Sequence, residues 1–194
     1  DEEITNRVQN YPKVAAALAA SPFDLRQFAN AVRNCWVMMG QYDGIRFNAF
    51  VSDSNGATTA IRRLVENFPE DDENASKRIE EFLKSAVKLG FSTPAHYLDW
   101  AGAASLASLM LTSLYPARFV DYRRERWKRY AETFGYEQPS VNASRGDWVI
   151  WVGKFAKEIC ETATYQEFWP QTERRLSNPL WVIAGICWTG LSPQ

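Results

Sequence analysis

Apolar residues recur at three- and four-residue spacing along most of the chain, and this period is typical of amphipathic helices. The first series runs from Ile4 to Leu18, with Pro12 as an expected break or kink. Asp24 can cap a second helix, which we expect to end at Gly40. Three later series predict further helices: 57–68 before Pro69, 79–89 before Gly90, and 94–114 before Pro116.

The second half of the chain continues the helical pattern. Asp121 is a candidate cap for a helix that should end at Gly135 and face inward with Trp127, Tyr130 and Phe134. Residues 138–146 are the most loop-like part of the chain. Three more helices are expected beyond this loop, over 148–159, around 165–169 and from Pro179 to Trp188.

One stretch departs from the helical period. After the turn signal Tyr42-Asp43-Gly44, residues 45–51 alternate between apolar and polar positions, which predicts a short strand. No second strand is marked for it to pair with. Because no repeat, low-complexity tract or flexible linker divides the chain, we expect one mainly α domain over 1–194. It should contain about eight helices and at most one small β element around 45–51.

Composition agrees with a globular protein, since 46% of the residues are hydrophobic and 23% are charged. Eight Trp, eight Tyr and eleven Phe imply a core built around rings. The apolar run from Leu180 to Trp188 is too short to cross a bilayer, so we expect no membrane partner. The three cysteines have no CxxC spacing and leave an odd thiol, which favours a reducing, cytoplasmic compartment.

Residue types that carry most enzymatic chemistry are sparse. His96 is the only histidine, which excludes a histidine-rich metal site and leaves a catalytic triad with a single candidate base. Neither a P-loop nor a G-x-G-x-x-G motif occurs. Asp99 beside Trp100 is the one acid placed for desolvation, and Cys160 resembles a buried small hydrophobe. We therefore expect a non-catalytic protein that needs no metal or cofactor.

The run from Tyr115 to Tyr136 is both basic and aromatic. Between Arg118 and Arg129 it holds six basic residues, opposed only by Asp121 and Glu125. Arginine dominates, and its planar fork grips phosphate oxygens bidentately and stacks on bases, which favours nucleic acid as a partner. The predicted nucleic-acid-binding residues, with Tyr122 as a stacking or wedge residue, are Arg118, Tyr122, Arg123, Arg124, Arg126, Lys128 and Arg129.

An ordinary amphipathic helix would give the same pattern. Glu125 could pair with Arg129, Asp121 could pair with Arg124, and the acidic stretch 70–81 could dock against the basic run. The net charge is −1, so any attraction to a polyanion must be local. Two functions therefore remain open. One is a module that binds duplex DNA through its phosphates, and the other is a helical protein-interaction or scaffold domain.

The segment from Leu106 to Tyr136 resembles the N-terminal regions of McrB-like proteins, the AAA+ subunits of modification-dependent restriction systems. The residues that carry this resemblance are Tyr115-Pro116, Arg118-Phe119, Tyr122 and Phe134-Gly135, with a further likeness over Pro179–Trp188. The family's nucleotide-binding motifs are missing from this chain. The resemblance implies a DNA-binding or connecting module of a defence system, excised from a longer protein, with a C-terminal NTPase module and its nuclease subunit as partners.

Overall fold

The structure is a computed structural model that describes residues 2–35, 41–89 and 100–163. Within these ranges the chain forms eight helices and no strand, so the prediction of a mainly α fold is confirmed. The helices are α1 (Glu2–Ala19), α2 (Leu25–Cys35), α3 (Gln41–Ser52), α4 (Ser54–Val65), α5 (Asp72–Leu89), α6 (Trp100–Leu114), α7 (Arg124–Phe134) and α8 (Arg145–Glu161).

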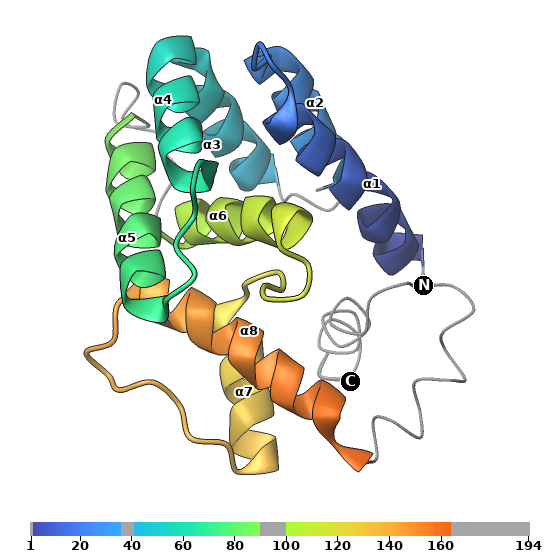
Figure 1. Cartoon of the computed structure of the whole chain (residues 1–194), viewed down its shortest axis with the longest axis vertical. Coiled ribbons are helices and arrows are strands. Elements are labelled where there is room, and N and C mark those ends of the chain that lie inside the picture. Colours follow the sequence, from blue (N-terminus) through green and yellow to red (C-terminus); the bar gives the residue numbers. More distant parts are fainter. Residues whose placement is uncertain (1, 36–40, 90–99, 164–194) are drawn as a thin grey trace.

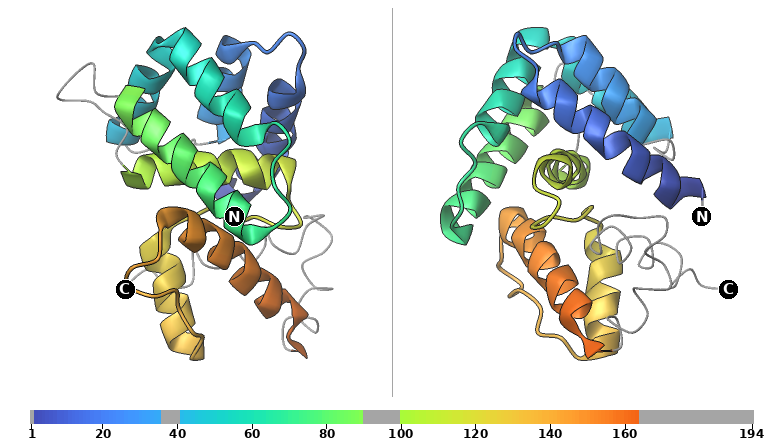
Figure 2. Two further views of the ribbon diagram at one scale, coloured as in Figure 1. Left: turned by 60° about the vertical axis from the view of Figure 1, so that its left-hand side comes forward. Right: turned by 45° about the vertical axis from the view of Figure 1, so that its right-hand side comes forward.

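Helix α6 lies at the centre of the fold, and the right-hand view of Figure 2 looks nearly along its axis. Helices α1, α4, α5 and α8 all contact it. Its residues are mostly Ala, Ser and Leu, and every residue from Ala103 to Ser113 is buried. A helix that is apolar on all sides must be covered on all sides, which explains its central place.

Two helix pairs flank α6, and α8 packs against α5 (Figure 1). Helix α1 packs along α2, and α4 packs along α5. The predicted cap of α2 is confirmed, because the Asp24 carboxylate accepts hydrogen bonds from the backbone N–H groups of Arg26 (2.8 Å) and Gln27 (3.1 Å). Pro12 lies inside α1, which continues past it.

The predicted strand at 45–51 is wrong, because these residues lie within helix α3. Phe47 and Phe50 are both fully buried, and their three-residue spacing places them on one face of the helix. The Phe50 ring packs edge-on against Phe82 of α5, with ring centroids 6.2 Å apart. A lone strand would have left its backbone groups without partners, whereas a helix satisfies them internally.

Several helix boundaries also differ from those expected. Helix α4 begins at Ser54, where Asp53 caps it by accepting a hydrogen bond from Gly56 N–H at 3.0 Å, and it ends at Val65. Phe68 lies beyond its end and packs on Tyr115 and Phe119. The expected elements at 36–40, 90–99 and 165–188 lie outside the described residues.

Helix α8 is held closely against the rest of the protein. Ser144 and Asp147 form a reciprocal capping box at its start. Gly146 lies against the backbone of Ser76 in α5, and Gly153 lies against the carbonyl oxygen of Arg118, so a β-carbon at either position would collide with that backbone. These close approaches place the first turn of α8 beside α5 and its middle beside the α6–α7 connection.

Candidate anion-binding site

The segment that joins α6 to α7 turns back along α6. The Ser108 hydroxyl accepts a hydrogen bond from the backbone N–H of Tyr122 at 2.9 Å. The Ser105 hydroxyl donates to the Tyr122 carbonyl oxygen at 3.3 Å. Because Ser105 lies in the second turn of α6, this pairing brings the start of α7 next to the start of α6.

Helix α7 is anchored by Trp127. Its ring is fully buried against Phe155 of α8, and its indole N–H donates to the Asp121 carbonyl oxygen at 2.9 Å. The predicted capping role of Asp121 is wrong, since Arg123 occupies the N-cap position and forms no side-chain cap. Asp121 lies two residues before this N-cap and is buried, and its backbone carbonyl oxygen accepts the hydrogen bond from Trp127.

The expected end of α7 at Gly135 is confirmed. Gly135 has a left-handed backbone with φ of 68°, and Tyr136 N–H reaches back to the Ala131 carbonyl at 2.8 Å. The predicted burial of Phe134 is wrong, because 59% of its surface is exposed. It is the last residue of α7, and its ring lies 5.8 Å from the Tyr130 ring, centroid to centroid.

A cavity of about 400 Å³ lies where α6, α7 and α8 begin, and we name it the arginine cavity. Ala101 and Ser105 line it from α6, and Arg145 lines it from the first position of α8. Among the described residues, its four arginines are opposed by one lining carboxylate, that of Glu125. The described lining residues are Ala101, Ser105, Tyr122, Arg123, Arg124, Glu125, Arg126 and Arg145.

Two of these arginines are positioned by tryptophan rings. The Arg124 guanidinium lies over the Trp148 ring, 4.6 Å from its centroid. The Arg145 guanidinium lies over the Trp100 ring at 5.5 Å. Stacking of this kind orients a guanidinium through its flat face, so its N–H edge stays available for hydrogen bonds to an anion.

Tyr122 lines the arginine cavity from inside the core, with 4% of its surface exposed. The predicted role as a stacking or wedge residue is therefore wrong, because no face of the ring is open to a base. Burial raises the pKa of Tyr122 to about 12, although Arg124 and Arg145 oppose that shift. The phenol thus stays protonated at physiological pH and can donate a hydrogen bond.

Arg118 does not face the cavity. Its guanidinium donates to the Pro69 carbonyl at 2.7 Å, pairs with Asp72 at 3.2 Å and lies over the rings of Phe68 and Phe119. Asp72 also pairs with Lys154 of α8. Burial opposes ionisation of Asp72, but hydrogen bonds and charge from Lys154 and Arg118 outweigh it and lower the pKa of this carboxyl. Arg118 therefore joins the α6–α7 connection to the start of α5.

The other predicted binding residues lie on the outer part of α7. Lys128 is half-buried and lies 4.0 Å from Glu132, and Arg129 is exposed. The arginine cavity includes neither of them. The pairs expected for Glu125 with Arg129 and for Asp121 with Arg124 do not occur among the ion pairs of the described residues. Of the acidic stretch 70–81, Asp72 docks on Arg118 rather than on α7.

The sequence interpretation missed Arg145. It lies in the expected loop 138–146, at least sixteen residues beyond the basic run, and only the approach of α8 to α7 brings it to the cavity. One local signal was present. The first turn of a helix favours acids because of the helix dipole, so arginine at the first position after the Ser144 cap is unusual.

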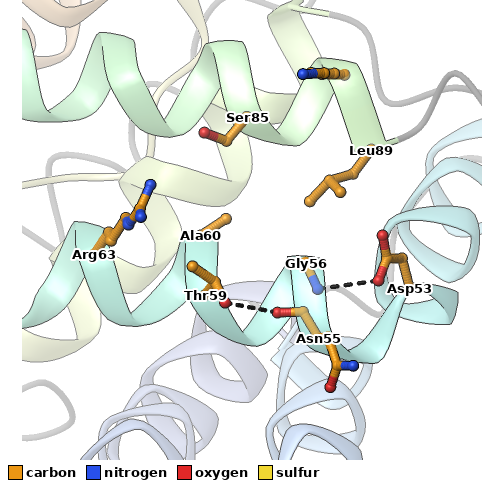
Figure 3. A pocket seen from close by; sticks show the side chains of 9 residues that line it. Asp53, Asn55, Gly56, Thr59, Ala60, Arg63, Ser85 and Leu89 are labelled. Carbon is orange, nitrogen blue, oxygen red and sulfur yellow. Dashed lines mark hydrogen bonds between the residues drawn. The ribbon is translucent and has the colours of Figure 1, made fainter.

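A larger pocket, about 630 Å³ in volume, lies between α4 and α5 (Figure 3). Three of its polar side chains form hydrogen bonds within α4 and α5 or at the start of α4. Asp53 caps α4 through Gly56, Thr59 donates to the Asn55 carbonyl, and Ser85 donates to the Glu81 carbonyl. No set of groups in this pocket converges on one point, so we do not regard it as the functional site.

Other chemistry considered from the sequence finds little support. Cys35 and Cys160 are both buried thiols, in agreement with the interpretation of Cys160 as a small hydrophobe. His96 and Asp99 lie outside the described residues. Among those residues that are described, no cluster of three His, Cys, Asp or Glu side chains is arranged to hold a metal ion.

Comparison of the chain with protein-family models, with curated proteins and with solved structures found no match. In the described part of the chain, no helix combines the length and apolar character needed to cross a membrane.

Proposed function

We propose that this protein binds nucleic acid, with duplex DNA as the expected form, and that it holds phosphate groups in and beside the arginine cavity. The observation that carries the proposal is the convergence of Arg123, Arg124, Arg126 and Arg145 on one cavity, where Glu125 is the one acid among the described lining residues. Arginine binds phosphate through paired N–H groups, and the two Trp-stacked guanidiniums are already oriented for it.

Helix geometry supports the same proposal. Helices α6, α7 and α8 all begin at the cavity, and the start of a helix carries a partial positive charge that favours anions. The backbone N–H groups of Gly146 and Asp147, at the start of α8, donate to the side chains of Glu80 and Ser144. Helix α8 therefore acts on an anion in the cavity through its dipole and through the Arg145 side chain. Exposed Arg129 on the outer side of α7 can contact a neighbouring phosphate of the same duplex.

Salt-dependent binding tests this proposal. We expect a fluorescently labelled duplex to bind, and its affinity to fall steeply between about 50 and 200 mM salt, because each neutralised phosphate releases counterions. Replacing Arg124 and Arg145 together by glutamine should weaken binding at least about tenfold and reduce the salt slope by roughly two. Absence of binding at low salt would refute the proposal.

A matched control distinguishes binding at the arginine cavity from nonspecific attraction by positive surface charge. Arg26 on α2 and Lys157 on α8 are both exposed, and neither lines the cavity. Their double replacement by glutamine removes the same formal charge as the cavity variant. It should leave the affinity nearly unchanged, and thermal unfolding should show that both variants are folded. Equal loss in the two variants would indicate nonspecific attraction.

A second candidate function is a helical protein-interaction or scaffold domain. Phe134 is 59% exposed and Val141, in the α7–α8 connection, is 93% exposed, and exposed apolar side chains of this kind anchor partners. If this function is the correct one, serine at both positions should abolish self-association or partner capture, measured by light scattering and pull-down. The same variant should retain DNA binding if the first proposal holds.

The resemblance to McrB-like N-terminal regions gives the proposal a setting, a cytoplasmic defence system in which this chain acts upstream of an NTPase module. The buried Cys35 and Cys160 side chains are in keeping with a reducing compartment. Purification from the native host, followed by mass spectrometry, should recover an NTPase in the same polypeptide and its nuclease subunit. Recovery of the chain alone would contradict this setting.

A further inference from the structure

Two guanidiniums of the arginine cavity, those of Arg124 and Arg145, are each oriented by a tryptophan ring and come from different helices. Two such cations can bind more than one oxygen of the same phosphate. A phosphodiester within a nucleic-acid strand carries a single negative charge. A terminal phosphate carries about −1.5 to −2 charges at pH 7 and exposes three strong acceptor oxygens.

Tyr122 supplies an independent reason to expect a ligand. Its hydroxyl belongs to a residue that is buried, with 4% of its surface exposed, and that lines the cavity, yet no group in the described part of the chain forms a hydrogen bond with it. The hydroxyl is not one of the fully buried polar atoms that lack a partner, so it opens into the cavity and is available to donate a hydrogen bond to a ligand there. The charged groups that act on this hydroxyl are Arg124, Arg145, Glu125 and Glu80.

We propose that the arginine cavity binds a terminal phosphate, the phosphomonoester at the 5′ end of a nucleic-acid strand. Arg124 and Arg145 grip its oxygens from α7 and α8, and the Tyr122 hydroxyl donates a hydrogen bond to the third oxygen. This inference rests on the proposed nucleic-acid binding and makes strand ends, rather than the interior of a duplex, the preferred ligand.

The position of Tyr122 explains how the cavity would distinguish a terminal phosphate from a phosphodiester within a strand. Its backbone is tied to Ser105 and Ser108 of α6, so the hydroxyl is fixed relative to the two arginines. A fixed neutral donor between fixed cations suits a compact group with three free oxygens. A phosphodiester offers only two such oxygens, since both of its other oxygens are esterified.

The test compares two duplexes that differ only in bearing a 5′-phosphate or a 5′-hydroxyl. At pH 7 we expect the phosphorylated duplex to bind about tenfold more tightly, a difference that matches one charge-assisted hydrogen bond. The preference should shrink between pH 7 and pH 5, because the second pKa of a phosphomonoester is about 6. The 5′-hydroxyl duplex, titrated in parallel, corrects for protonation of the protein itself.

Variants make the test specific. Tyr122→Phe removes only the hydroxyl, so it should abolish most of the preference while the protein stays folded. Tyr136→Phe is the matched control, since Tyr136 packs on Phe155 and does not line the cavity. A nucleoside 5′-monophosphate and inorganic phosphate serve as competitors, and stronger displacement by the nucleotide would identify the strand end as the source of the phosphate.

The outcomes separate this inference from the proposed function. Equal binding of both duplexes, still sensitive to Arg124 and Arg145, would overturn the terminal-phosphate inference and leave nucleic-acid binding intact. If neither duplex binds, both the terminal-phosphate inference and the proposed nucleic-acid binding are overturned. An undiminished preference in Tyr122→Phe, with Tyr136→Phe unchanged, would also overturn the inference as stated.

Discussion

The Ser108 hydroxyl accepts a hydrogen bond from the Tyr122 backbone N–H at 2.9 Å, and both residues are buried. This contact turns the chain back along α6 after Pro116. It therefore determines where α7 begins and fixes Tyr122 in the arginine cavity. A single serine in the central helix thus links the core of the fold to the candidate binding site.

Ser108→Ala should lower both stability and anion affinity. It leaves the buried Tyr122 N–H without its acceptor, which costs about 1–3 kcal/mol of unfolding free energy. Ser113→Ala is the control, since the Ser113 hydroxyl donates to the Leu109 carbonyl oxygen of its own helix. Urea denaturation should show a clearly larger loss for Ser108→Ala. Equal losses would mean that the contact to Tyr122 does not hold the connection.

Gly153→Ala should destabilise the protein, because the new β-carbon collides with the carbonyl oxygen of Arg118. Forcing α8 away from this backbone should cost about 1–3 kcal/mol, as overpacking does elsewhere. Gly44→Ala in α3 is the matched control, since nothing lies within 4 Å of the position that its new methyl group would take. That change should be neutral or stabilise by about 0.5–1 kcal/mol. Thermal unfolding of both variants measures the contrast.

Arg118→Gln should act on stability rather than on binding. It removes the hydrogen bond to Pro69, the ion pair with Asp72 and the stacking on Phe68. The expected loss is about 1–2 kcal/mol, because the side chain remains partly exposed to solvent. Arg129→Gln removes the same charge from an exposed position and should leave the unfolding free energy within about 0.5 kcal/mol of the original. Loss of DNA binding in a folded Arg118→Gln protein would contradict this assignment.

Acid should weaken the junction between α5 and α8 through Asp147. Burial opposes ionisation of this carboxyl, but hydrogen bonds from Ser76 and Ser144 outweigh it and lower its pKa. A group whose pKa is lower in the folded state contributes stability above its unfolded pKa, about 3.9, and loses that contribution as the pH falls through its folded pKa. The contribution is therefore complete near neutral pH.

Asp147→Asn should accordingly be less stable than the original protein at pH 7, and the difference should narrow below about pH 4. Urea denaturation at pH 7 and pH 3 provides the measurement. Glu158→Gln, an exposed acid on the same helix, should show no comparable narrowing. A constant difference for Asp147→Asn at both pH values would show that the carboxylate charge does not stabilise the junction.

Much of the helical architecture could be predicted from local sequence. The Asp24 cap, the stop before Pro116 and the left-handed Gly135 each act within one or two turns, so short stretches of sequence contain their cause. The strand predicted at 45–51 was wrong because a two-residue alternation would place Phe47 and Phe50 on opposite faces. Both rings are buried, with Phe50 against Phe82 of α5, and this common burial fits the three-residue spacing of a helix.

The candidate site was predictable only in part. Local sequence was sufficient to predict that an arginine-rich helix follows an apolar helix, but not that this apolar helix is the central one. Tertiary structure decided which arginines converge: it assigned Arg118 to Asp72, buried Tyr122, and brought Arg145 to Arg124. The physical reason is that charge and periodicity are properties of neighbouring residues, whereas a cavity forms only where helices distant in sequence pack together.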